Sequence, residues 1–138
     1  YLQTLVNQPK RVLDLLASDL EPLIAAGEQM ARLAGYLTEH FAEGREPTWL
    51  TIGAHRVPGY NASFFESELG NTLSRKHGAA VAIFRFKGAA VNFSFRSTDE
   101  HSPSALELAT ALGGGGHRNA SGASVPLEKF VAMLEFGK

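Results

Sequence analysis

The sequence predicts an α/β fold: a mixed β-sheet covered by helices and preceded by a long N-terminal linker helix. Two observations lead to this prediction. Segments with the composition of strands are interleaved with segments whose apolar residues recur at helical spacing. The 138 residues, 44% of them hydrophobic, are also enough to bury one sizeable core. Strands are expected at residues 48–56, 80–86, 89–96 and 121–125.

The N-terminal part of the chain is predicted to be helical. Pro9 stands where a first helical position is expected, and apolar residues follow it up to Leu16. From Leu20 to Phe41 apolar residues keep helical spacing, which indicates a long amphipathic helix that stops near Gly44. Residues 44–47, Gly-Arg-Glu-Pro, combine a helix-breaking glycine, two charges and a proline, so we predict the boundary between two parts of the chain there. We expect residues 1–46 to be a helical connector and residues 47–138 a second domain.

Residues typical of turns and helix caps indicate where the strands and helices of the second domain begin and end. Residues 58–61, Pro-Gly-Tyr-Asn, have the composition of a turn after the first strand. Ser63 with Glu66 has the spacing of a capping box that opens a helix, with Arg75, Lys76 and His77 in its last turn before Gly78. His77 is therefore expected to stabilise the helix end rather than bind a ligand.

The next two strands are expected to form a hairpin around Lys87 and Gly88. Side chains alternate along a strand, so Val91, Phe93 and Phe95 should pack while Asn92, Ser94 and Arg96 offer polar groups. Ser104 with Glu107 repeats the capping-box spacing before a helix that ends at Gly113. A last helix is expected from Pro126 to Leu134.

Composition narrows the function. Thirteen Lys and Arg against fourteen Asp and Glu give a net charge of -1, so any contact with nucleic acid must be local. The absence of cysteine excludes disulfides, thiolate metal sites and a thiol nucleophile, and it fits a reducing, cytoplasmic compartment. No apolar run has the length of a membrane span. The start, from Tyr1 to Thr4, contains neither an initiator methionine nor a signal peptide, so we expect a fragment of a longer protein.

A glycine tract carries the strongest chemical signal. Glycines 113–116 permit backbone conformations that point several N–H groups into one concavity, which suits phosphate oxygens. His117 and Arg118 add donors beside it, and Arg118 can bind an anion through two parallel bonds. Arg96 and Ser97 close the second hairpin strand, from where a guanidinium could reach a phosphate. A flexible linker and a solvated surface arginine are the simpler alternatives.

A hydrolytic metal site is not expected in this chain. Such a site needs several well-separated oxygen and nitrogen ligands, and the chain has only three aspartates. Two of them, Asp14 and Asp19, belong to predicted helix ends. Asp99, Glu100 and His101 form the one acidic and imidazole cluster, which we interpret as loop and helix-start residues. No catalytic residue is assigned.

Three segments in this order, Ser94–Ser97, the helix over 103–112 and the tract from Gly113 to Gly122, resemble the C-terminal associated domain of the DHH phosphoesterases. The resemblance implies that Arg96 and Ser97 face an interdomain cleft. It also implies that Gly114, Gly115 and Gly116 with His117 hold the terminal phosphate or nucleotide of a short oligonucleotide or related phosphoester. Arg118 would be an auxiliary contact.

The same resemblance implies partners that this chain lacks. The Asp-His-His signature and the aspartates that bind manganese in the family are absent here, so Mn²⁺ or another divalent metal would belong to an N-terminal catalytic domain of the same polypeptide. The present chain alone would not hydrolyse a substrate and would carry no cofactor. Two alternatives stay open: an RNA-binding module like the related C-terminal domain of alanyl-tRNA synthetases, and a structural domain that forms a homodimer.

Overall fold

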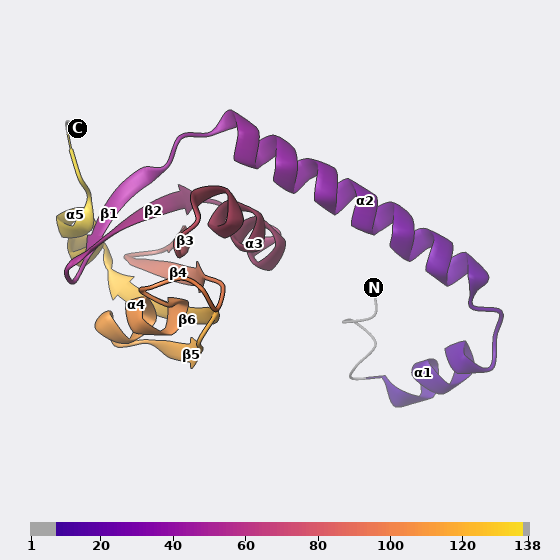
Figure 1. Cartoon of the computed structure of the whole chain (residues 1–138). Coiled ribbons are helices and arrows are strands. Elements are labelled where there is room, and N and C mark those ends of the chain that lie inside the picture. The colour runs from indigo at the N-terminus through magenta and orange to yellow at the C-terminus, as the bar shows by residue number, and fades with distance from the viewer. Residues whose placement is uncertain (1–7, 137–138) are drawn as a thin grey trace. The chain divides into compact units, whose positions relative to one another are not determined.

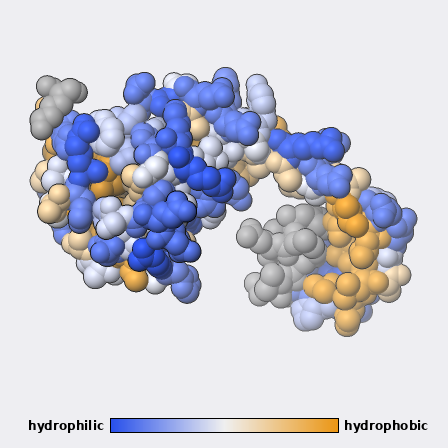
Figure 2. Space-filling view, in the orientation of Figure 1, coloured by the Kyte–Doolittle hydropathy of each residue, from blue (hydrophilic) through white to orange (hydrophobic). Residues whose placement is uncertain are grey.

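The computed structural model describes residues 8–136, so the prediction made from Tyr1 to Thr4 lies outside the described residues. The chain divides into two compact units, Tyr1–Leu37 and Thr38–Lys138, which are described separately. The first contains α1 (Pro9–Leu16) and the beginning of α2 (Glu21–Gly44). Figure 2 shows hydrophobic residues gathered over α1 and the start of α2, where Leu13, Leu16 and Ile24 are 66%, 67% and 51% exposed. No residue of α1 is buried.

The second unit is built on one mixed sheet, as the sequence predicts (Figure 1). The strand order is β1-β2-β3-β4-β6-β5, in which β2 and β3 are parallel and all other neighbours are antiparallel. A parallel pair requires a crossover connection, and α3 (Glu66–His77) supplies it. The strands are β1 (Thr48–Ile52), β2 (His55–Asn61), β3 (Val81–Lys87), β4 (Ala90–Arg96), β5 (Gly115–His117) and β6 (Ala120–Pro126).

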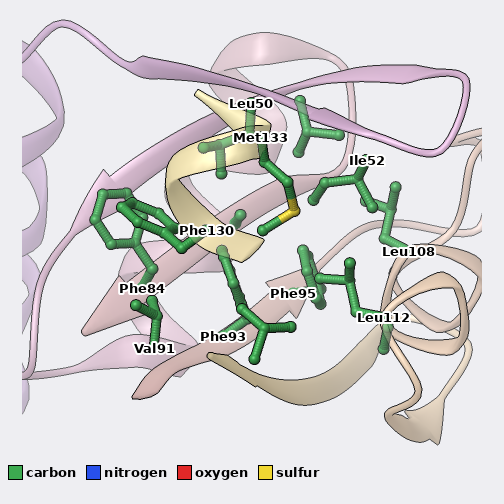
Figure 3. Packing of buried hydrophobic residues seen from close by; sticks show 14 of the residues in the cluster. Leu50, Ile52, Phe84, Val91, Phe93, Phe95, Leu108, Leu112, Phe130 and Met133 are labelled. Atoms are coloured by element: carbon green, nitrogen blue, oxygen red, sulfur yellow. The ribbon is translucent and has the colours of Figure 1, made fainter. Parts of the chain in front are cut away.

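Helices α4 (Ala105–Ala111) and α5 (Leu127–Met133) pack on one face of the sheet and enclose the larger core. Phe130 of α5 lies against Phe84 and Phe93, with ring centroids 4.9 and 6.0 Å apart (Figure 3). Phe93 stacks on the fully buried Phe95 at 5.4 Å. Val91, Phe93 and Phe95 alternate with polar residues along β4, so the predicted hairpin and its buried face are confirmed.

Helix α3 packs on the opposite face and encloses a second, smaller core. Its Leu69 and Leu73 meet Val81 and Ile83 of β3, and Phe41 from the end of α2 joins the same cluster. At the end of α3 the hydroxyl of Tyr60 lies 2.7 Å from Nε2 of His77. Burial is the main cause that raises the pKa of Tyr60 and lowers the pKa of His77.

The prediction of a single strand at 48–56 and a turn at 58–61 is wrong. The chain turns earlier, at Gly53, whose φ is +60°, and β2 continues through Asn61. Gly59 lies inside that strand because it pairs with both Thr48 and Ala82. A Cβ at Gly59 would come within 2.8 Å of the Leu50 side chain. The glycine therefore serves close packing rather than a turn.

The predicted capping box at Ser63 and Glu66 is also wrong. Phe65 is the N-cap of α3, in the left-handed region at φ 45° and ψ 41°, and its side chain makes no capping bond. Glu66 instead turns toward the sheet, where it meets Arg85 and Ser94. The tertiary contact thus replaced the local one.

The second predicted capping box is confirmed. The Ser104 hydroxyl accepts from the Glu107 N–H at 3.2 Å, and the Glu107 carboxylate accepts from the Ser104 N–H at 2.7 Å. These hydrogen bonds lower the pKa of Glu107. Gly78 ends α3 and Gly88 lies in the hairpin turn, both at φ +60°, as their positions in the sequence predict.

Candidate functional site

The glycine tract is divided between a helix end and a strand. Gly113 has φ +81° and donates to the Thr110 carbonyl at 3.0 Å, and Gly114 donates to the Ala109 carbonyl at 2.8 Å. Both amides close the last turn of α4, a common use of glycine at a helix end. These two N–H groups are engaged within the fold, so the expected phosphate-binding concavity does not include them.

The rest of the tract forms β5, a strand that the sequence did not predict because three residues are too few to show alternation. A Cβ at Gly114 would lie 2.1 Å from the Gly122 carbonyl oxygen, and one at Gly116 would lie 2.7 Å from that of Ala120. A Cβ at Gly115 would meet no atom within 4 Å. Gly114 and Gly116 therefore let β5 lie tightly against β6, whereas Gly115 borders free space.

The strand register brings residues of β4 beside residues of β5 and β6 that are far from them in the sequence. Arg96 pairs with Ala120, which pairs on its other side with His117. One step along, Ser94 pairs with Gly122, which pairs with Gly115. Directly opposed residues point to the same face of a sheet. We call the surface formed by these six residues the open face: Ser94, Arg96, Gly115, His117, Ala120 and Gly122.

The floor of the open face is made of small residues. Ala120 and Gly122 lie on the central strand, between Arg96 on one side and His117 on the other. Among the described residues, the helices packed against β5 and β6 are α4 and α5, which lie on the other face with the larger core. Gly115 and His117 are accordingly exposed, and Ala120 and Gly122 are half-buried. Backbone and small side chains are thus accessible between two nitrogen-bearing side chains.

Arg96 is held in place by two hydrogen bonds, and its guanidinium has further N–H groups that can donate. Its Nη1 donates to the Phe95 carbonyl at 2.9 Å, and its Nη2 donates to the Ser67 hydroxyl of α3 at 3.0 Å. The stem of the side chain passes over Gly70, where a Cβ would come within 2.4 Å of its Cγ. Within residues 8–136 no carboxylate forms an ion pair with this guanidinium. Five N–H groups with two engaged leave capacity for an anion.

Ser97, also predicted to contact the ligand, is only 4% exposed. Its hydroxyl accepts from the Ala105 N–H at 2.9 Å and lies 3.3 Å from the Arg118 carbonyl oxygen and 3.2 Å from Oδ1 of Asn119. These bonds tie the start of α4 to the turn between β5 and β6. Ser97 thus lies next to the open face as a support for the turn that follows His117.

Arg118 bonds to a neighbouring loop. Its Nη2 donates to the Asp99 carbonyl at 3.1 Å, and Asn119 donates to the Asp99 carboxylate at 2.6 Å. His101, in the same loop, accepts from the Thr98 N–H through Nδ1 at 3.1 Å. The acidic and imidazole cluster thus holds the loop together. In the part of the chain that the structure describes, no three His, Asp or Glu side chains lie close enough to hold a metal ion.

Two residues beside the open face were not identified from the sequence. Glu66 and Ser67 come from the first turn of α3 and reach β4 across the fold. Their sequence context indicates only a helix start, because their contacts depend on how α3 crosses the sheet. The described part of the chain contains no helix with the length and hydropathy of a membrane span.

Comparisons with known proteins give distant likenesses of fold. No model of a protein family matches the chain, and no curated protein sequence matches it significantly. An uncharacterised protein from Helicobacter pylori G27 is similar in structure, with 22% identity and a TM-score of 0.46. That match covers 65% of this chain and 24% of the Helicobacter chain. The C-Ala domain of Aquifex aeolicus alanyl-tRNA synthetase is similar at 18% identity and a TM-score of 0.41, over 61% of this chain and 87% of that domain.

Proposed function

We propose that the second unit binds the terminal phosphate of a nucleotide or short oligonucleotide. In this proposal it is the substrate-holding part of a DHH-type phosphoesterase whose metal-bearing catalytic domain lies elsewhere in the same polypeptide. The observation that carries the proposal is the cross-strand row Arg96, Ala120, His117 on the open face. The chemistry of that row, rather than the distant structural likenesses, supports it.

The row suits a phosphate for geometric reasons. With one strand between them, the Cα atoms of Arg96 and His117 are about 10 Å apart, since neighbouring strands are about 4.8 Å apart. His117 is exposed beside Ala120, which has only a methyl group, and Arg96 has N–H groups beyond those bonded to Phe95 and Ser67. A phosphate above Ala120 could then accept from the guanidinium on one side and from the imidazole on the other. Arg118, held by Asp99, stays an auxiliary contact, and Ser97 is assigned a positioning role.

The chain's own residues would bind and orient the phosphoester rather than cleave it. The described carboxylates and imidazoles do not fit a hydrolytic metal site, so no chemical step is assigned to a metal here. The protein would contribute orientation, which lowers the entropic part of the barrier when a reacting group is supplied from another domain. A net charge of -1 agrees with recognition by two local groups rather than by a general field.

The test is a titration of the whole chain with a short oligoribonucleotide in three forms: 5′-phosphorylated, 3′-phosphorylated and without a terminal phosphate. Chemical-shift changes should cluster at residues 94–96 and 115–122 and should require the phosphate. Arg96→Gln and His117→Gln should each weaken binding roughly tenfold or more, as expected for a hydrogen bond to a charged group. Arg75→Gln, an exposed arginine in the last turn of α3, is the matched control and should leave affinity unchanged.

Other outcomes would favour the alternatives. Tight binding of structured RNA without regard to a terminal phosphate would support an RNA-binding module. The absence of shifts with every oligonucleotide, together with a concentration-dependent dimer in solution, would support a structural domain and would contradict the proposal.

A further inference from the structure

The second row of the open face differs chemically from the first. It consists of Ser94, Gly122 and Gly115, and Glu66 of α3 reaches over its β4 side. The Ser94 hydroxyl donates to Oε2 of Glu66 at 2.5 Å, while Oε1 of Glu66 is paired with the Arg85 guanidinium. The Glu66 side chain is 22% exposed, so it is partly accessible to solvent.

This pair offers lone pairs and no proton. Ser94 has one hydroxyl hydrogen, which is used toward Glu66, and an ionised carboxylate is an acceptor only. Each carboxylate oxygen can accept more than one hydrogen bond, so Glu66 keeps capacity beyond Arg85 and Ser94. A ligand group that meets the pair must therefore donate. An ionised phosphate oxygen cannot donate, and it would also face the negative charge of Glu66.

Two groups of residues lie side by side. The row Arg96, Ala120, His117 can donate hydrogen bonds, and the pair of Glu66 and Ser94 can accept them. Ser94 and Arg96 are two residues apart on β4, which is about 7 Å along a strand. Glu66 and Ser67 are consecutive in the chain, and Ser67 accepts from the Arg96 guanidinium. A nucleotide has the same sequence of chemistry over a short span: a phosphate that accepts, followed by sugar hydroxyls that donate.

Building on the proposed function, we infer that Glu66 and Ser94 receive a sugar hydroxyl of the nucleotide whose phosphate lies between Arg96 and His117. The open face then prefers ribonucleotides to deoxyribonucleotides. Glu66 is in this way a specificity residue that acts by direct contact with the sugar.

The test measures the affinity of the whole chain for 5′-phosphorylated diuridylate and for the matching deoxyuridine dinucleotide. The wild type should bind the ribonucleotide about tenfold more tightly, as expected for a hydroxyl hydrogen-bonded to a charged acceptor. Glu66→Gln should bring the ratio toward one by weakening only the ribonucleotide. Its dependence on the terminal phosphate should persist, because Arg96 and His117 are unchanged.

Two control variants separate contact from structure. Glu68→Gln removes an exposed charge from the same helical turn, and Arg85→Gln removes the ion pair while keeping the Glu66 carboxylate. Both should retain the ribose preference, and urea unfolding of each variant checks that α3 stays in place. If either control lost the preference as fully as Glu66→Gln, the inference would be overturned.

The two proposals fail in different ways. Equal binding of phosphorylated and unphosphorylated dinucleotides by the wild type would contradict the proposed function itself. Phosphate-dependent binding with equal affinity for the ribose and deoxyribose forms would leave that function standing and would refute the role of Glu66 alone.

Discussion

The two faces of β4 have different roles: one packs in the larger core, and the other carries polar side chains. Val91, Phe93 and Phe95 are 0%, 3% and 0% exposed and lie in the larger core. Ser94 and Arg96, which alternate with them, point to the other face and bond to α3. Folding stability and the polar surface are therefore carried by alternate residues. Substitutions on one side of the strand should change the free energy of unfolding, and those on the other side should change binding.

The largest effect is expected on the core side. Phe95→Ala removes a fully buried ring that stacks on Phe93, so the free energy of unfolding should fall by about 3–5 kcal/mol. Urea unfolding followed by circular dichroism measures it. Phe86→Ala is the control, because that ring is 57% exposed and its loss should cost far less. Both rings lie on the core side of the sheet, so equal costs for the two variants would contradict burial as the cause of the loss.

A smaller effect is expected at Ser97, where the strand leaves the sheet. Ser97→Ala leaves the buried N–H of Ala105 without its acceptor, which should cost about 1–3 kcal/mol. Oligonucleotide affinity should fall as well, because the turn after His117 loses its support. Ser97→Thr keeps the hydroxyl and should retain both properties. Lower affinity with unchanged stability would instead indicate a direct contact with the ligand.

The free energy of unfolding should depend on pH through His77, in the last turn of α3. The pKa of His77 lies below its ordinary 6.5, through burial and the nearby Lys76, so the unfolded chain takes up the proton more readily than the folded one. Stability from this group is therefore complete above about pH 6.5 and declines as pH falls through that value toward the lower folded pKa. Urea midpoints measured from about pH 8 to pH 5 should show this decline. His77→Gln should flatten it, and an unchanged slope would assign the decline to other groups.

The smallest effect on stability is expected at Gly115. Gly115→Val adds a side chain where no atom lies within 4 Å, so the free energy of unfolding should change by about 0.5 kcal/mol or less. The added side chain projects over the open face and should abolish phosphate-dependent binding. Gly114→Ala is the counterpart, because its Cβ would meet the Gly122 carbonyl and should destabilise the fold. Undiminished binding by a folded Gly115→Val protein would remove the proposed site.

The sequence predicted what depends on local spacing. The alternation along β4 gave its buried and polar faces, and the Ser104–Glu107 spacing gave a capping box that the structure contains. Of the site, the choice of Arg96 and His117 came from residue type and from the family resemblance. Neither source could show that they share a row across three strands.

What could not be predicted depends on contacts between distant segments. Ser63 and Glu66 have the spacing of a cap, yet Glu66 bonds to the sheet once α3 crosses it. Gly59 was interpreted as a turn residue because its role depends on Leu50 in the neighbouring strand. Ser97 was interpreted as a contact residue because nothing in its local sequence indicates that its hydroxyl would be buried against α4.

The position of β5 has a consequence for local unfolding. This strand has three residues, all exposed, and it is bonded to a single neighbour at the edge of the sheet. Short edge strands open at much lower free energy than the core, so β5 can detach while the two cores stay folded. Such an opening carries His117 away from Arg96. A ligand that bridges the two residues therefore closes the edge of the sheet, and slower hydrogen exchange at residues 115–117 is the signature of its binding.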